Sequence, residues 1–209
     1  MNPKLTIPAA LLALLVAWFL WPSAKVTNLE SRGTAVIAFG DSLTAGFGAG
    51  EGEDYPSKVA AAIGKEVVNA GVSGDTTESA LARLESDVLS RSPRVVIVGL
   101  GGNDFLRQTP IAETEANLRR VVRTVQAEGA MVVLLGFEFP SMRDDWADMY
   151  ERVSKDEGCL LIEDVLDGIL RDPALRSDPI HPNAAGYAVM AERVSGPVGK
   201  LLARADAAR

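Results

Sequence analysis

The residues of this chain that could do chemistry together are one serine, one aspartate and the single histidine. His181 lies between two prolines and three residues after Asp178, and Ser42 follows the apolar run at residues 36–39. A serine hydroxyl is a weak nucleophile until an imidazole accepts its proton and a carboxylate orients that imidazole. Ser42, His181 and Asp178 are therefore a candidate nucleophile, base and orienting acid.

Each of these residues also has a purely structural explanation. Asp41 and Ser42 suit the start of a helix, where Asp and Ser often cap free backbone N–H groups. A lone histidine is often a surface or structural residue. The two prolines fix the backbone around His181, and Asp178 is close enough to meet its second ring nitrogen. These features favour the catalytic interpretation.

Acyl transfer also needs hydrogen-bond donors for the negative charge that develops on the carbonyl oxygen. Gly74 can bring a backbone N–H close to a substrate, and Asn103 can supply a side-chain amide N–H. Both residues lie in glycine-rich polar stretches, residues 71–76 and 101–104. Such stretches are also common turn compositions, so neither residue is diagnostic alone.

Apolar runs that alternate with helical patterns are expected to position these residues. This alternation predicts βαβ units and a parallel sheet, with strands at residues 34–39, 66–70, 95–100, 131–136 and 160–162. Apolar residues recur at helical spacing between the strands, at Ala80, Leu81, Leu84, Val88 and Leu89, and at Ile111, Leu118, Val121, Val122 and Val125. Glycine and polar clusters follow the strands, so the candidate residues should meet at the carboxyl edge, where open α/β sheets bind ligands.

Two helix starts are also predicted. Thr109 is expected to be an N-cap, with Pro110 as the first helical residue. Asn183 is expected to cap the last helix, which should bury Tyr187, Ala191, Val194 and Val198.

Four short blocks, in this order along the chain, resemble the SGNH hydrolases of the GDSL family. They are Gly40-Asp41-Ser42-Leu43, Val72-Ser73-Gly74-Asp75-Thr76, Gly101-Gly102-Asn103-Asp104 and Asp178-Pro179-Ile180-His181-Pro182. The sequences of the blocks are most similar to those of the bacterial thioesterase I, lysophospholipase and arylesterase group. The resemblance implies a Ser42, Asp178 and His181 triad, with an oxyanion hole formed by Ser42, Gly74 and Asn103. It also implies a flavodoxin-like three-layer α/β/α sandwich with a five-stranded parallel sheet.

Composition limits the partners of the protein. A chain of 209 residues that is 47% hydrophobic fits one domain. A net charge of −7 without a Lys/Arg cluster argues against nucleic acid as a partner. With one histidine and one cysteine, Cys159, the sequence offers no soft metal-ligand set. The glycines at residues 46–52 do not match a dinucleotide fingerprint, so we expect neither a metal nor a cofactor.

The amino-terminal segment bears on localisation. Residues 5–21 are apolar and uncharged, and Lys4 precedes them. We expect a membrane anchor at residues 1–24, a linker at 25–33 and the hydrolase domain at 34–209. The positive start places the amino terminus in the cytoplasm and the domain outside, with the Ser42 crevice near the lipid headgroups. The alternative is a cleaved signal peptide and a periplasmic or secreted enzyme.

The expected activity is hydrolysis of carboxylic esters or thioesters, such as short acyl esters, lysophospholipids and acyl thioesters, through an acyl-enzyme. The alternatives are a carbohydrate O-acetyl esterase of the cell envelope and a catalytically silent, membrane-tethered binding domain. Apolar residues after the fourth expected strand could bind an acyl chain or could pack in the core; they are Phe137, Phe139, Pro140, Met142, Trp146 and Met149.

Overall fold

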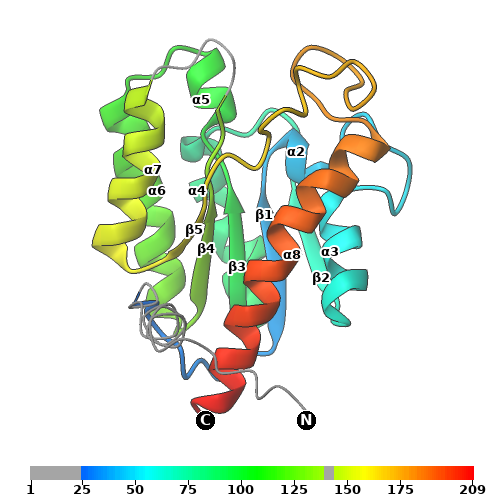
Figure 1. Ribbon diagram of the computed structural model, residues 1–209. Coiled ribbons are helices and arrows are strands. Elements are labelled where there is room, and N and C mark those ends of the chain that lie inside the picture. The colour runs from blue at the N-terminus through cyan, green and yellow to red at the C-terminus, as the bar shows by residue number, and fades with distance from the viewer. Residues whose placement is uncertain (1–24, 139–143) are drawn as a thin grey trace, which may run out of the picture.

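A five-stranded parallel sheet forms the centre of the computed structural model, which describes residues 25–138 and 144–209 (Figure 1). The strands lie in the order β2-β1-β3-β4-β5, and every neighbouring pair is parallel. Their bounds are Ala35–Gly40 (β1), Val67–Gly71 (β2), Pro93–Gly99 (β3), Met131–Leu135 (β4) and Leu160–Ile162 (β5). All five expected strands are present, with ends that differ by at most two residues.

The central strands are buried along their whole length. Every residue of β3 and β4 is buried, as are five of the six residues of β1. Parallel strands read as continuous apolar runs when both faces of their sheet are covered. The Val- and Ile-rich sequences of these strands therefore fit the middle of a three-layer structure.

Helices cover both faces of the sheet (Figure 1). α3 and α8 lie on one face and contact each other, and α4, α6 and α7 lie on the other, where α6 contacts both neighbours. The helix bounds are Ser42–Ala45 (α2), Tyr55–Ile63 (α3), Thr77–Asp87 (α4), Gly102–Leu106 (α5), Ile111–Ala127 (α6), Asp144–Glu157 (α7) and Ala184–Ala207 (α8), with a 3-10 turn at Leu89–Arg91. The expected three-layer α/β/α sandwich is confirmed.

Most of the predicted apolar helix faces point inward. Ala80 and Leu84 of α4 are buried, as are the α6 residues from Leu118 to Val125 that recur at helical spacing. Asn183 caps α8 as predicted, because its side chain accepts hydrogen bonds from Ala185 N and Gly186 N.

The predicted start of α6 is wrong by one residue. Pro110 is the cap, and Ile111 is the first helical residue. The backbone N–H of Thr109 donates to the carbonyl of Asp104. Thr109 therefore closes the turn after α5 and does not cap α6.

The segment expected to be a linker lies against the domain. Val26 is buried in the core, Thr27 N donates to Gly158 O at 2.8 Å, and the Asn28 side chain donates to the carbonyls of Gln126 and Ala130. These partners precede β5 and β4. Residues 26–28 are therefore packed against the domain at the amino ends of the strands, at the lower end of Figure 1.

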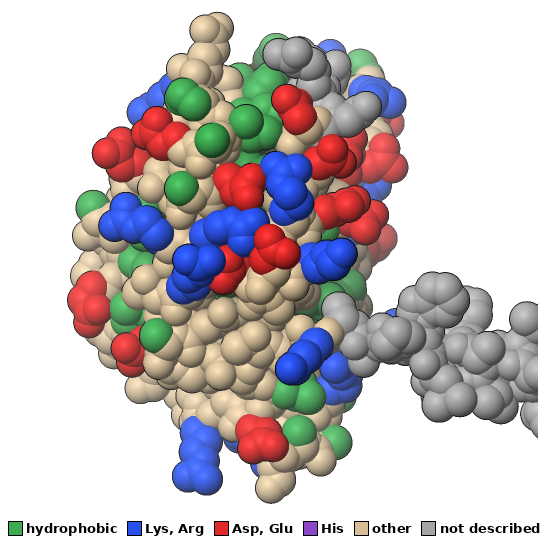
Figure 2. All heavy atoms as spheres, turned by 90° about the vertical axis from the view of Figure 1, so that its left-hand side faces the viewer, with side chains coloured by type: hydrophobic (Ala, Val, Ile, Leu, Met, Phe, Trp, Pro, Cys, Tyr) green, Lys and Arg blue, Asp and Glu red, His purple; other side chains and the backbone are tan. Residues whose placement is uncertain are grey.

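An ion-pair network connects α6 and α7 on the outer face of their layer (Figure 2). Arg119 pairs with Glu115, Asp156 and Glu157, and Figure 2 shows acidic and basic side chains gathered on this face. Two further arginines, Arg123 and Arg152, pair with Glu157 and Glu115. Single exposed pairs contribute little to stability, whereas a network with shared, partly buried carboxylates contributes more.

Within residues 25–138 and 144–209, no helix has both the length and the apolar character that a membrane span requires.

Candidate active site

The strand order makes the ends of β1 and β3 the topological switch point of the sheet, where open α/β sheets bind ligands. In the order 2-1-3-4-5 the chain winds in opposite directions on the two sides of this point, so the loops after β1 and β3 diverge. Ser42 begins α2 directly after β1, and Asn103 lies in α5 directly after β3. Topology therefore brings these two predicted residues to the same opening.

Small residues at the strand ends allow α2 to lie close to the sheet. Gly40 pairs with Gly71 of β2 and with Gly99 of β3. A Cβ atom at Gly71 would lie 2.2 Å from the backbone nitrogen of Ala45 in α2. The side chain of Asp41 caps α2 by accepting from Leu43 N at 3.0 Å. The capping explanation therefore holds for Asp41, while the side chain of Ser42 has another partner.

That partner is the single histidine. Ser42 Oγ lies 2.9 Å from His181 Nε2, and His181 Nδ1 lies 2.7 Å from Asp178 Oδ2. The other oxygen of Asp178 accepts from the backbone N–H groups of Ile180 and His181. The structure thus brings all three predicted residues into one hydrogen-bonded chain from hydroxyl to imidazole to carboxylate.

The carboxylate of Asp178 is held in its charged form. Partial burial acts to raise the pKa of Asp178, but the N–H of Ile180 and the imidazole of His181 outweigh burial and hold this pKa below its ordinary value. An ionised Asp178 accepts the Nδ1–H of His181. The lone pair of Nε2 then faces the hydroxyl of Ser42.

The loop after α2 contacts the imidazole from a second side. The ring of Phe47 lies 4.5 Å from the ring of His181, and the carbonyl of Phe47 accepts from the hydroxyl of Tyr187 in α8. Phe47 was not predicted from the sequence as a site residue. The available signal was an aromatic residue in the glycine-rich stretch five residues after Ser42.

The two further oxyanion candidates follow β2 and β3, the strands on either side of β1: Gly74 lies in the loop after β2, and Asn103 lies in α5. Gly74 has a φ of +86°, in the left-handed region that favours glycine. The amide nitrogen of Asn103 donates to the carbonyl of Asp75 at 2.9 Å and to the carboxylate of Asp41 at 3.3 Å. Asp75 adjoins Gly74 in the chain, and Asp41 adjoins Ser42. Asn103 is therefore joined to the segments that carry Gly74 and Ser42, the other two candidate donors.

Asp41 is an unusual carboxylate because it is buried directly before Ser42 in the chain. The residue is 2% exposed. Burial raises the pKa of Asp41 to about 7, against the hydrogen bond from Leu43, and the carboxylates of Asp75 and Asp104 add to the rise. Folding therefore opposes the ionisation of Asp41 at neutral pH.

This ionisation predicts a pH dependence of stability. The ordinary pKa of 3.8 applies to Asp41 in the unfolded chain, and the folded value is about 7. The ionisation of Asp41 therefore does not lower the free energy of unfolding below pH 3.8. Between pH 3.8 and 7 this ionisation makes the free energy of unfolding fall as the pH rises. The cost at pH 8 is about 4 kcal/mol. In Asp41→Asn this pH-dependent fall should be absent. The free energy of unfolding of the variant should therefore rise relative to that of the wild type between pH 4 and 7. Urea denaturation measures both values. A difference that stays constant with pH would contradict the account.

The candidate acyl-binding residues are mainly core residues. Phe137, Trp146 and Met149 are buried at 1%, 8% and 0% exposure. Phe139, Pro140 and Met142 lie outside the described residues. The core interpretation therefore holds for the three that can be assessed: Trp146 and Met149 belong to α7, which packs against β4 and β5, and the ring of Phe137 contacts the ring of Tyr150 in the same helix.

Exposed apolar side chains instead occur in segments that follow strands at the carboxyl edge. Among the described residues, the exposed large hydrophobic side chains are Phe47, Val72 and Leu106. They follow β1, β2 and β3, the strands that lead to Ser42, Gly74 and Asn103. Among residues 25–138 and 144–209, no cluster of three or more His, Cys, Asp or Glu side chains is arranged to hold a metal ion.

Comparison with known proteins agrees with this geometry. Residues 38–189 match the GDSL-like lipase/acylhydrolase family. The chain is 30% identical over 184 residues to esterase TesA of Pseudomonas aeruginosa, covering 83% of this chain and 92% of that protein. It is also 30% identical over 166 residues to thioesterase 1/protease 1/lysophospholipase L1 of Escherichia coli (strain K12), covering 76% of this chain and 80% of that protein.

A solved structure gives the same result in three dimensions. The crystal structure of TesA superposes with a TM-score of 0.73 at 30% identity, and the match covers 81% of this chain and 100% of the TesA chain. The residues that match the family, 38–189, contain the four sequence blocks together with strands β2 to β5 and helices α2 to α7. The chain therefore belongs to the GDSL-like lipase/acylhydrolase family and is a GDSL-type serine hydrolase that cleaves esters.

Proposed function

We propose that this protein hydrolyses carboxylic esters and thioesters of acyl groups through an acyl-enzyme on Ser42. The observation that carries the proposal is the hydrogen-bonded chain from Ser42 Oγ through His181 to Asp178, with links of 2.9 and 2.7 Å. The first distance lies in the range that proton transfer from a nucleophile to a base requires, and the second allows the carboxylate to orient the imidazole.

In the first half of the reaction, His181 Nε2 accepts the proton of Ser42 as Oγ bonds to the carbonyl carbon. The carbonyl oxygen becomes an oxyanion, which accepts hydrogen bonds from the backbone N–H groups of Ser42 and Gly74 and from one N–H of the Asn103 amide. That N–H gives up its longer contact, 3.3 Å, with the carboxylate of Asp41. When the intermediate collapses, the bond to the alkoxide or thiolate breaks and His181 returns the proton to this leaving group. Asp178 stabilises the imidazolium between the two transfers.

In the second half, water attacks the acyl-enzyme carbonyl and gives its proton to His181. The tetrahedral intermediate forms in the same oxyanion site and then releases the carboxylic acid, and Ser42 recovers its proton. No redox partner or metal takes part in this sequence.

The proposed role of Asn103 makes a quantitative prediction. Asn103→Ala removes one oxyanion donor, and loss of one such donor costs about 10²- to 10³-fold in kcat. KM should change much less, because the bond strengthens as negative charge develops. Steady-state kinetics on a short acyl ester measures both constants.

Asn28→Ala is a matched control for Asn103→Ala. The amide of Asn28 also donates to two acceptors, the carbonyls of Gln126 and Ala130, but it lies at the opposite edge of the sheet. This variant should lose stability and keep its kcat. An Asn103→Ala protein with full activity on every ester tested would rule out the proposed oxyanion role.

The apolar side chains at the carboxyl edge support an acyl substrate. Phe47, Val72 and Leu106 are 53%, 44% and 46% exposed, although burying such side chains is normally favourable. An acyl group bound beside Ser42 would cover part of this apolar area. The expected substrates are therefore short acyl esters, lysophospholipids and acyl thioesters.

A substrate series tests the proposed function. The panel contains p-nitrophenyl esters of increasing acyl length, acyl-CoA thioesters, a lysophospholipid and acetylated xylan. We expect kcat/KM to rise with acyl length before it levels off. Activity confined to acetylated xylan would favour the carbohydrate esterase instead, and absence of turnover on the whole panel would indicate a silent binding domain.

We further propose that the apolar segment at residues 5–21, which lies outside the described residues, holds the domain on the outer side of the cytoplasmic membrane. Residues 26–28 attach at the amino edge of the sheet, while Ser42 lies at the carboxyl edge. A strand of five residues separates these edges by about 17 Å. This attachment favours a crevice that faces away from the membrane, contrary to the expectation that it lies near the headgroups. Mass spectrometry of the mature amino terminus tests the anchor, and a chain beginning near Lys25 would show a cleaved signal.

A further inference from the structure

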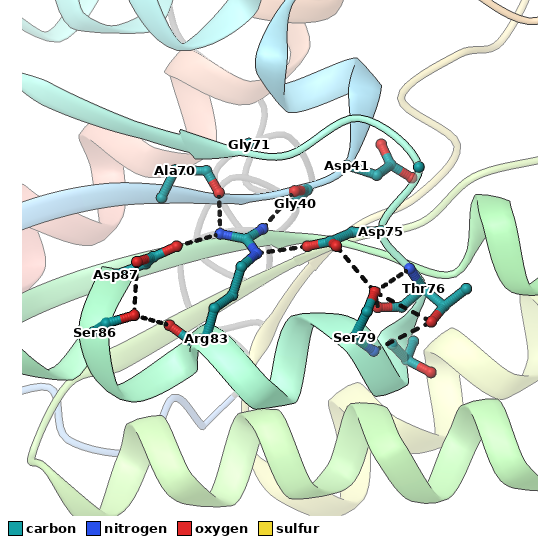
Figure 3. Close-up of polar contacts among 12 residues, drawn as sticks. Gly40, Asp41, Ala70, Gly71, Asp75, Thr76, Ser79, Arg83, Ser86 and Asp87 are labelled. Atoms are coloured by element: carbon teal, nitrogen blue, oxygen red, sulfur yellow. Dashed lines mark hydrogen bonds and ion pairs between the residues drawn. The ribbon is translucent and has the colours of Figure 1, made fainter.

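Arg83 of α4 connects the ends of the two strands that lead to Ser42 and Gly74. Its Nη2 donates to the carbonyl of Gly40 at 2.9 Å, and its Nη1 donates to the carbonyl of Ala70 at 2.9 Å. Its Nε donates to the carboxylate of Asp75 at 2.6 Å. Figure 3 shows the guanidinium lying between these three acceptors, which come from β1, β2 and the loop after β2.

The acceptors adjoin the reacting groups. Gly40 is two residues before Ser42 in the chain. Asp75 directly follows Gly74, and its carbonyl accepts the amide of Asn103 at 2.9 Å. One guanidinium therefore joins the segment that carries the nucleophile to the loop that carries one oxyanion donor and orients another.

The setting of Arg83 makes this link rigid. Its side chain is 16% exposed, and its guanidinium carbon lies 4.4 Å from the ring centre of Phe39, which is fully buried. A planar guanidinium can donate to several acceptors in fixed directions, which an ammonium group cannot do. Asp75 is held from its other side by the hydroxyl of Ser79, at 2.9 Å (Figure 3).

Arg83 also balances charge near the nucleophile. The carboxylate of Asp75 lies close enough to Asp41 to raise the pKa of that residue. An unpaired Asp75 would oppose the negative charge of an oxyanion formed nearby. The ion pair with Arg83 offsets the charge of Asp75.

We propose that Arg83 is a positioning residue for ester hydrolysis: it ties Gly40 to Asp75 and so fixes the Gly74 and Asn103 donors relative to Ser42 Oγ. The proposal rests on the proposed function. Its consequence is that removal of Arg83 weakens transition-state binding more than substrate binding, because the donors act on the developing oxyanion.

The test compares Arg83→Met with Arg119→Met. Arg119 is a matched control because it is 18% exposed, pairs with three carboxylates and joins α6 to α7 away from the catalytic edge. We expect Arg83→Met to lower kcat about 10²-fold, as displacement of catalytic groups by about 1 Å does, with KM within about twofold. Arg119→Met should lower the melting temperature and leave kcat unchanged.

Two further measurements separate positioning from loss of folding. Affinity for an alkylboronic acid, which forms a tetrahedral adduct with serine, should fall in Arg83→Met by about the same factor as kcat, as expected for a transition-state analogue. Arg83→Lys should restore stability more than kcat, since lysine keeps the charge but not the planar donors. If Arg83→Met does not fold, Asp75→Asn provides the same test with a smaller perturbation.

The results distinguish this proposal from the proposed function. Wild-type turnover that Ser42→Ala abolishes would support the function, whatever Arg83 does. An Arg83→Met or Asp75→Asn protein with unchanged kcat, or a kcat loss that Arg119→Met matches, would overturn the positioning role alone. Wild-type protein that hydrolyses no ester would overturn both.

Discussion

Replacement of Ser42 by alanine is expected to lower kcat by about 10⁵- to 10⁶-fold, the loss typical of removing the nucleophile of a serine hydrolase triad. Alanine cannot form the acyl-enzyme, so water would have to attack the ester directly. Ser42 Oγ contributes a bond to His181 but lies outside the apolar core, so the variant should fold normally. Single-turnover kinetics on an activated ester measures the loss.

Ser73→Ala is the control for this variant. Ser73 is an exposed serine in the loop after β2, at the same edge of the sheet as Ser42. Its replacement should leave kcat within about twofold, because surface substitutions seldom disturb the fold. If Ser42→Ala kept substantial activity and Ser73→Ala lost it, the nucleophile would be wrongly assigned.

Removal of His181 is expected to cost about as much as removal of Ser42, and removal of Asp178 about 10⁴-fold, because the carboxylate acts only through the imidazole. The double variant His181→Ala/Asp178→Ala should be hardly worse than His181→Ala alone. Triad effects are strongly non-additive, since an orienting acid has no function without its base. A double-mutant cycle on kcat/KM measures this coupling.

Asp164→Ala is a matched control for the loss of Asp178. The carboxylate of Asp164 also accepts two backbone N–H bonds, from Glu138 and Leu166, in the loop after β5. This variant should lose stability while keeping its activity. Fully additive effects of His181 and Asp178 would show that the two residues do not work as one unit.

Much of the fold was predictable from the sequence, because local hydrophobic patterns determine the strands. Continuous apolar runs indicated all five strands, and the resemblance implied the three-layer sandwich that the structure has. Polar residues after those strands had to meet at one edge, since every strand is parallel. The contacts of Ser42 with His181, 139 residues away, follow from this topology.

Features that depend on tertiary contacts were missed. The polar segment at residues 25–33 read as a linker, but Val26 packs in the core and Asn28 binds carbonyls about 100 residues later in the chain. The sequence left open whether Phe137 and Trp146 bind an acyl chain or pack in the core, because no sequence pattern shows that α7 packs against β4 and β5. Arg83 reads as a polar residue of an amphipathic helix, because the two acceptors that link it to the strands are the backbone carbonyls of Gly40 and Ala70, a group that every residue possesses.

The most direct measurement is the site at which a serine-reactive phosphonate labels the protein. Native protein would be treated with an alkyl phosphonate and digested, and the adduct located by tandem mass spectrometry. The account predicts one adduct, on Ser42, formed in parallel with loss of esterase activity and absent from His181→Ala, in which the hydroxyl lacks its base. Labelling of Ser73 or another serine, with Ser42 unmodified in the inactivated enzyme, would contradict it.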